Sequence, residues 1–154
     1  AALAAADDER VTLELMGMTY VASEGDENQV VIAAERATVH PDIEVARLEQ
    51  MRATISARPA EGSSGGLDMT CDRGLFELAS GDFVAEGDVR GTTADGRRFR
   101  TSQLRYRHDT GRVVAHVPVE IRDAAGTYRG GGFEYWVREN RFRLSGGATV
   151  VQEP

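Results

Sequence analysis

Residues 113–121 have the sequence VVAHVPVEI, and their pattern decides the fold class. The odd-numbered positions are apolar throughout, whereas His116, Pro118 and Glu120 lie between them. Alternation with a period of two is typical of a strand that buries one face. The same alternation recurs in three further stretches: residues 11–15, 133–137 and 142–144. The sequence therefore predicts an all-β protein.

Short clusters that contain Gly, Asp or Asn predict turns between these strands. They lie at residues 24–28, 72–74, 94–96, 109–111, 124–126 and 139–140. In the second half of the chain the turns recur roughly every 15 residues. This spacing predicts strands of roughly ten residues that bend at bulges. A loop is predicted over residues 57–67 (ARPAEGSSGGL), because Pro, Gly and Ser leave little to bury.

One segment, residues 43–55 (IEVARLEQMRATI), allows two interpretations. A helix would gather four apolar residues on one face: Val45, Leu48, Met51 and Ile55. Propensity alone favours it, because Glu, Arg, Leu, Gln and Met are good helix formers. The segment can also be two β alternations separated by a phase slip. Because the neighbouring segments are all predicted strands, we favour the strand.

A faint internal repeat links two parts of the second half. Residues 104–106 (LRY) recur in kind as residues 133–135 (FEY), 29 positions later. Each unit consists of two long strands and two turns. Stacked hairpin units predict a one-dimensional β architecture rather than a closed barrel. Such a stack ends in edge strands, which are natural docking sites.

Composition narrows the function classes. A chain of 154 residues fits one domain, and its net charge of −7 argues against general nucleic-acid binding. The charge is uneven, since residues 1–88 are acidic and residues 89–154 are basic. Either the solvated faces differ by chance, or the two ends meet different partners. The single Cys excludes an internal disulfide framework and a metal site built from several Cys.

The sequence contains no recognisable arrangement of catalytic residues. Cys71 has no base at a recognisable spacing and is predicted to be buried and inert. His116 lies opposite the apolar stripe and is predicted to be exposed. The run of Gly130–Gly132 predicts close strand packing or a bulge rather than a phosphate loop. We therefore expect neither enzymatic activity nor a cofactor.

The second half also carries a family resemblance. It is strongest in residues 87–147, GDVRGTTADGRRFRTSQLRYRHDTGRVVAHVPVEIRDAAGTYRGGGFEYWVRENRFRLSGG. The succession of G-x-V, a Gly turn, L-x-Y, V-x-V-x-I, G-G-x-x-Y and L-x-G resembles the periplasmic bridge proteins of lipopolysaccharide export, and LptC more than LptA. The resemblance extends from about Val11 to Val151, and its early part includes residues 31–37 and 45–48.

The resemblance implies an open, twisted antiparallel β-jellyroll of two layers, of the OstA/LptA type. It implies that lipopolysaccharide acyl chains lie between the layers and that the protein passes them on without chemistry or a cofactor. The implied partners are lipopolysaccharide, an inner-membrane lipopolysaccharide ABC transporter and a soluble LptA-like bridge protein. No nucleic acid is expected.

The resemblance also implies a location and a domain plan. Residues 11–154 are expected to form a single periplasmic β-jellyroll domain. Residues 1–10 are expected to be a disordered tail, or a linker from an N-terminal helix that anchors the protein in the inner membrane. If the Ala-rich start is instead a signal-peptide remnant, a soluble LptA-like role is favoured.

Strand parity predicts which side chains line the lipid groove. The predicted groove residues are Phe99, Leu104, Tyr106, Val113, Val117, Val119, Ile121, Phe133, Tyr135, Phe142 and Leu144. Weaker candidates from the first half are Leu13, Leu15, Phe76 and Leu78. The predicted docking edge for the next bridge protein comprises Leu144, Thr149, Val150 and Val151. The charge asymmetry leads to a further hypothesis, that exchange of three arginines for Glu weakens partner binding: Arg138, Arg141 and Arg143.

Two classes of function stay open at this point. The first is a lipid-conducting bridge, whose layers part to admit acyl chains. The second is an interaction module whose apolar stripes fill a closed core and which binds only proteins through its edges. Binding of an apolar fluorescent probe separates the two, because a filled core does not admit the probe.

Overall fold

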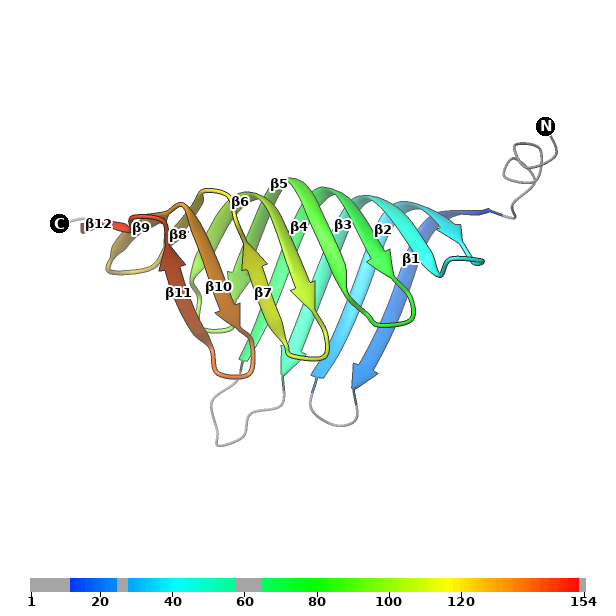
Figure 1. The fold of residues 1–154 in the computed structure, drawn as a ribbon, viewed down its shortest axis with the longest axis horizontal. Coiled ribbons are helices and arrows are strands. Elements are labelled where there is room, and N and C mark those ends of the chain that lie inside the picture. Colours follow the sequence, from blue (N-terminus) through cyan, green and yellow to red (C-terminus); the bar gives the residue numbers. More distant parts are fainter. Residues whose placement is uncertain (1–11, 25–27, 58–64, 153–154) are drawn as a thin grey trace.

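The computed structural model describes residues 12–24, 28–57 and 65–152 (Figure 1). The described residues form twelve strands and no helix. The strands are β1 (Leu13–Glu24), β2 (Asn28–His40), β3 (Val45–Ala57), β4 (Gly65–Glu77), β5 (Phe83–Thr93), β6 (Arg98–Arg107), β7 (Arg112–Ala115), β8 (Val119–Arg122), β9 (Gly126–Gly130), β10 (Gly132–Trp136), β11 (Arg141–Ser145) and β12 (Thr149–Gln152). The predicted tail at residues 1–10 lies outside the described residues.

The strands form one antiparallel sheet that divides at β6. From β1 to β6 each strand pairs with the next along the chain. The first part of β6, at Arg98–Thr101, pairs with β8, whereas its last part, at Arg105–Arg107, pairs with β7. β10 and β11 continue the sheet from β7, and β9 and β12 continue it from β8. We call these two parts the front layer (β7, β10, β11 and the halves of β1–β6 that continue from β7) and the back layer (β8, β9, β12 and the halves of β1–β6 that continue from β8).

The long strands β1–β6 cross both layers and fold over a common ridge, which runs along the top of Figure 1. At this ridge the pairing between neighbouring strands is interrupted in mid-strand. The interruptions lie at Gly17 in β1, at Gln50 in β3, at a bulge between Thr70 and Arg73 in β4, and at a bulge between Glu86 and Val89 in β5. Gly17 and Gln50 have φ angles of 78° and 53°, which lie in the left-handed region. A bulge bends a strand and increases its twist, so a line of bulges folds the sheet into two layers.

The ridge also explains the ambiguous segment. β3 buries Ala46 and Leu48 before the ridge, and Met51, Ala53 and Ile55 after it. The alternation therefore shifts by one residue at Gln50, and this shift imitates helical spacing. The predicted strand with a phase slip is confirmed.

Two local predictions fail at the ridge and beside it. The turn predicted at residues 72–74 is wrong, because these residues lie inside β4 at the bulge. The predicted loop at 57–67 is too long, since β3 runs to Ala57 and β4 begins at Gly65, and its residues 58–64 lie outside the described residues. Of the predicted turn at 24–28, residues 25–27 are likewise outside them. The four later turns separate strands as expected.

The core lies between the two layers, where inward side chains from both meet. Phe99 of the back layer lies 5.5 Å from Phe133 of the front layer, measured between ring centroids. Burial of such side chains is the main stabilising contribution to a sheet sandwich. The fold is thus an all-β, open antiparallel β-jellyroll, and the predicted fold class is confirmed.

Candidate lipid-binding interior

The residues predicted to line a groove all face the interior. Eight of them are buried there: Phe99, Leu104, Tyr106, Val113, Val119, Ile121, Phe133 and Tyr135. The other three are half-buried and pack against the same cluster: Val117, Phe142 and Leu144. The strands bring all eleven together because each alternation is anchored to the same two layers. Their role in lipid binding stays a prediction.

Aromatic rings form the centre of this interior in the second half of the chain. The rings of Tyr135 and Phe142 stack at 4.3 Å between centroids, and Phe142 lies 5.9 Å from Phe133. Phe83 and Tyr106 form a further pair at 5.2 Å. The faces of these rings are apolar, so the interior matches the polarity of acyl chains.

Polar contacts close the open side of the jellyroll, opposite the ridge. The hydroxyl of Tyr135 donates towards Gly66 O at 3.2 Å and Asn140 Oδ1 at 2.9 Å, and Gly66 belongs to the back layer. The amide of Asn140 donates to Asp95 Oδ2 at 3.1 Å, again from front to back. Burial raises the pKa of Tyr135 to about 12, so its hydroxyl remains a donor at neutral pH.

A second contact closes the same side near the first strand. The hydroxyl of Tyr20 donates to Leu78 O at 3.1 Å, and its ring lies 4.7 Å from that of Phe76. Phe76 is buried and Leu78 is half-buried, so these two of the four weaker candidates face the interior. The layers are therefore held together at two separate places along the open side.

Most first-half residues of the interior were not predicted. Buried and facing the same cluster are Val30, Ile32, Leu48, Met51, Ile55, Leu67, Met69 and Phe83. The phase slip at the ridge conceals them, because the alternation before it and after it differs in parity. The signal that finds them is a shift of one residue near the middle of a 13-residue strand.

The apolar interior continues to both ends of the sheet. At one end Leu15 is the cross-strand partner of buried Ala37, so it faces inward, yet it is 37% exposed. Leu13 faces the same way and is 49% exposed. At the other end Leu144 is the partner of Phe133, and Val150, 56% exposed, is the partner of Tyr128. Inward apolar side chains thus reach solvent at both edges.

The predicted docking residues lie at the second of these edges. Among the described strands, β12 pairs only with β9, and β11 pairs only with β10. Thr149, Val150 and Val151 are exposed. An unpaired strand presents a row of backbone donors and acceptors, and such a row is a template for another strand. At the opposite edge β1 pairs only with β2.

The residues singled out for chemistry have ordinary structural roles. The Sγ of Cys71 donates to Arg73 O at 3.1 Å, and burial raises the pKa of the thiol to about 11. The reactive thiolate is therefore disfavoured at neutral pH. His116 is exposed between β7 and β8. Within the described residues no group of three or more His, Cys, Asp or Glu is placed to hold a metal.

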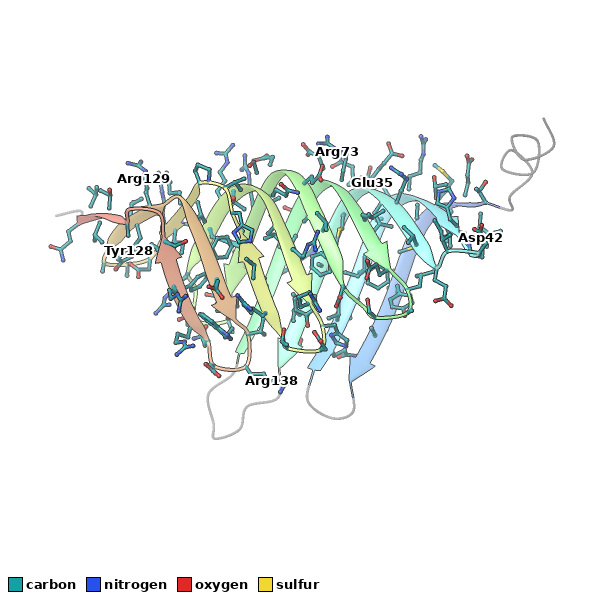
Figure 2. The ribbon with its side chains drawn as sticks, viewed as in Figure 1. Glu35, Asp42, Arg73, Tyr128, Arg129 and Arg138 are labelled. Atoms are coloured by element: carbon teal, nitrogen blue, oxygen red, sulfur yellow. The ribbon has the colours of Figure 1, made fainter. Side chains whose placement is uncertain are left out.

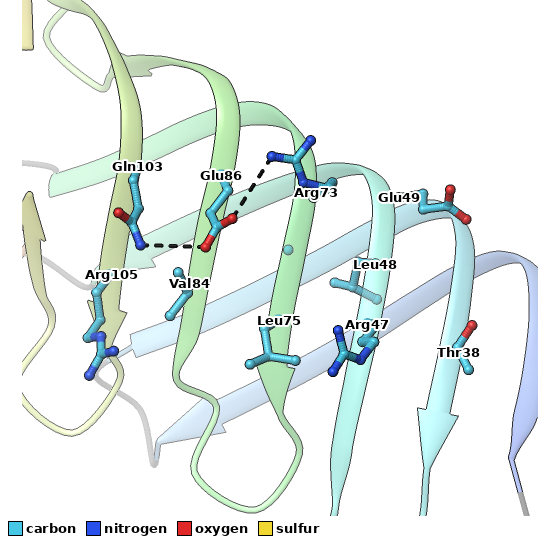
Figure 3. Close-up of a pocket in the computed structure, with 11 residues that line it drawn as sticks. Thr38, Arg47, Leu48, Glu49, Arg73, Leu75, Val84, Glu86, Gln103 and Arg105 are labelled. Carbon is cyan, nitrogen blue, oxygen red and sulfur yellow. Dashed lines mark hydrogen bonds and ion pairs between the residues drawn. The ribbon is translucent and has the colours of Figure 1, made fainter. Parts of the chain in front are cut away.

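A hollow of about 580 Å³ lies outside the interior, on the outer face of the front half of β3–β6 (Figure 3). Leu75 and Val84 form part of its floor. Glu86 Oε2 lies 3.9 Å from an Nη atom of Arg73, and Glu86 Oε1 accepts from Gln103 Nε2 at 3.5 Å. Charged pairs on an apolar floor make this a solvated surface hollow, distinct from the interior.

Comparison with known protein families gives one match. The model for lipopolysaccharide-assembly, LptC-related proteins matches residues 84–153. This part of the chain, 70 of its 154 residues, is similar to the LptC-related family. The match begins in β5 and includes every later strand, so it contains the division of the sheet and all of the predicted groove residues. No curated protein matches the chain.

The matched family acts in lipopolysaccharide transport. The family consists of transport proteins rather than enzymes, and its members associate with lipopolysaccharide and its transport machinery at the periplasmic side of the inner membrane. The described residues include no helix that is long and apolar enough to cross a membrane.

Proposed function

We propose that the interior between the layers binds the acyl chains of lipopolysaccharide and passes the molecule from the inner-membrane ABC transporter towards the outer membrane. The observation that supports this most is the continuity of the apolar interior. Inward apolar residues run from Leu13 and Leu15 at one edge to Leu144 and Val150 at the other, and these end residues reach solvent.

The physical need for such a conduit is large. Each CH₂ group of an acyl chain exposed to water costs about 0.8 kcal/mol. A continuous apolar surface removes this cost along the whole path, whereas a closed pocket removes it at one point only. No chemical step is required of the protein itself, and the driving energy comes from the transporter.

The free edge at β11 and β12 suits a handover. We propose that an LptA-like bridge protein adds a strand there, so that the two interiors become continuous. β11 carries Arg141 and Arg143, which contact Glu139 at 3.6 Å and Glu134 at 3.4 Å, respectively. Exchange of Arg138, Arg141 and Arg143 for Glu is expected to weaken this docking, measured by pull-down of the partner. Unchanged binding would show that these charges do not contribute to docking.

Photocrosslinking in cells tests the proposed function. We expect a crosslinking residue at Leu144, which faces inward, to form an adduct with lipopolysaccharide. The matched control is Arg143, its neighbour on the outer face, which is expected to form none. Adducts of equal strength at both positions, or at neither, would contradict a lipid path between the layers.

One observation favours the second candidate function, a module that binds proteins only. The interior side chains pack together closely, and Tyr106, Tyr135 and Phe76 are fully buried. If the layers never part, an apolar fluorescent probe added to the purified chain will show no increase in emission. The lipid-conducting function predicts an increase that lipopolysaccharide displaces.

A further inference from the structure

The outer face of the back layer carries arginines in an unfavourable arrangement. Arg90 on β5 is the direct cross-strand partner of Arg100 on β6. Two positions further along β6, Arg98 is the partner of Arg122 on β8. Like charges directly opposite each other destabilise a sheet. The stability of the fold therefore does not explain two adjacent pairs of this kind.

Two carboxylates hold most of these arginines by one edge only. Asp88 Oδ1 lies 3.1 Å from the Nε of Arg90 and 3.1 Å from the Nε of Arg100. Glu120 accepts from the Nε of Arg122 at 2.9 Å and from the Nε of Arg129 at 3.2 Å. These arginines lower the pKa of both carboxyl groups, so both remain charged near neutral pH.

This arrangement leaves the outer ends of the guanidinium groups available. Within the described part of the chain, Arg90, Arg100, Arg122 and Arg129 donate to these two carboxylates through Nε. Figure 2 shows Arg129 on the outside of the fold. Each carboxylate serves two guanidinium groups, so it fixes both side chains and neutralises only one charge. The remaining Nη atoms form preorganised donor pairs for an external anion.

A shallow basin of about 590 Å³ lies among these side chains. Thr70 and Thr92, which share the outer face with these arginines, form part of its floor, and their short side chains leave space. Five arginines and two carboxylates line it: Arg52, Arg90, Arg98, Arg100, Arg122, Asp68 and Glu120. Arg52 has a carboxylate partner of its own, since its Nη2 lies 2.8 Å from Asp68 Oδ2. The basin therefore has a clear excess of positive charge and a volume typical of a small-molecule site.

Arg98 provides the strongest argument that the basin binds an anion. It is exposed, and it has no ion pair with any residue of the described ranges. Its cross-strand partner Arg122 is already held by Glu120, so the space between these two guanidinium groups has no negative charge of its own. A dianionic group placed there accepts from both arginines and removes their mutual repulsion.

We propose that this basin, between Arg98, Arg122 and the Asp88-linked pair Arg90 and Arg100, binds the phosphate group of a phosphate ester. A phosphate offers three acceptor oxygens and up to two charges, which matches the forked donors around it. The site lies on the outer face, whereas the proposed acyl-chain path lies between the layers. The inference is therefore independent of the lipid-conducting function and does not fail with it.

Titration of the purified chain at low ionic strength tests the proposal. The probes are glucose 6-phosphate, as a soluble phosphate ester, and phosphatidylcholine vesicles containing phosphatidic acid, as a phosphate headgroup. We expect saturable binding of at least one probe, and about tenfold weaker binding for each arginine removed at the site, since a charge-assisted hydrogen bond is lost. The test variant is Arg98→Gln with Arg122→Gln.

The matched control removes two arginines from the outer face of the front half: Arg47→Gln with Arg105→Gln. These side chains are exposed and line the other hollow, so this variant loses the same charge elsewhere. Because the test variant relieves a like-charge pair, it is expected to unfold at a temperature no lower than the parent chain. Weak binding therefore does not arise from misfolding.

Comparison of the test variant, the control variant and the two probes distinguishes the outcomes. Loss of binding in the test variant with binding retained in the control supports the site. Saturation by glucose 6-phosphate then assigns it to soluble phosphate esters, and binding of vesicles alone assigns it to lipid headgroups. Failure of both probes to bind the parent chain, or equal losses in the two variants, would overturn the proposal.

Discussion

The first six strands and the last six reach the same two-layer arrangement in different ways. β1–β6 continue through the ridge as long strands that bend at bulges, as β4 and β5 do between Thr70 and Arg73 and between Glu86 and Val89. In the second part the chain is broken at the ridge, so that β7 and β8, β9 and β10, and β11 and β12 are short separate strands. Pro118, Gly131 and Gly146 lie at these breaks. A bend can therefore be made without interrupting a strand or by interrupting it.

This difference decides what the sequence reveals. In the second part each break is marked by Gly or Pro, so the alternation on either side is legible, and all of the predicted groove residues that lie there face inward. In the first part the bend at Gln50 has no such marker. The parity shift it causes makes residues 43–55 resemble a helix and conceals Met51, and the shifts in β2 and β4 conceal Ile32 and Met69 in the same way.

The fold class follows from local alternation, but the position of the ridge does not. The positive φ at Gln50 lies where the neighbouring strands bend as well, and no local propensity indicates it. The basin on the back layer was missed for a related reason. Arg90 and Arg100 are ten residues apart in sequence, and only the register of β5 with β6 places them opposite each other.

The largest expected effect tests whether the two parts share one core. Phe133→Ala removes a ring that contacts Phe99 across the layers and Phe142 beside it. We expect a loss of about 3–5 kcal/mol in the free energy of unfolding, measured by urea denaturation. Phe76→Ala in the first part is expected to cost a similar amount, because Phe76 is equally buried. Two separate unfolding transitions in either variant would show that the parts are independent.

A smaller effect distinguishes the two kinds of strand at a glycine. A Cβ at Gly132 on β10 would lie 2.8 Å from the backbone oxygen of Ala115, which cannot move without breaking the strand pair. A Cβ at Gly74 on β4 would meet Met51 Sδ, which belongs to a flexible side chain rather than to the backbone. We expect Gly132→Ala to lower stability by about 1–3 kcal/mol and Gly74→Ala to lower it by less. Thermal unfolding of both variants checks the order, and the reverse order would contradict this account of the ridge.

The contacts on the open side should differ in the same sense. Tyr135→Phe removes a buried donor to Gly66 O and Asn140 Oδ1, and we expect a loss of about 1 kcal/mol. Tyr20→Phe removes a donor to Leu78 O at a half-buried position near the edge, where water can replace it, so its loss is expected to be smaller. Denaturation of the two variants measures both. Equal losses would mean that the open side is closed uniformly.

The smallest expected effect concerns acid. Hydrogen bonding from Arg52 lowers the pKa of the Asp68 carboxyl group in the folded chain. Its contribution to stability is therefore complete above the ordinary pKa of about 3.9 and is lost as the pH falls through the lower folded value. Asp68→Asn is expected to reduce the pH dependence of stability below about pH 4 and to leave it unchanged at pH 7 relative to pH 5. An unaltered profile below pH 4 would contradict the assignment.

The central claim is that lipopolysaccharide lies between the layers, which requires the open side to part. Cys introduced at Asp95 and Asn140, whose side chains meet across that side, allows the layers to be linked with a short bifunctional thiol reagent. Buried Cys71 is expected not to react, and the same variant without the linker serves as the control. We predict that the linked protein does not bind lipopolysaccharide and that the unlinked variant does. Equal binding by both forms would contradict the claim.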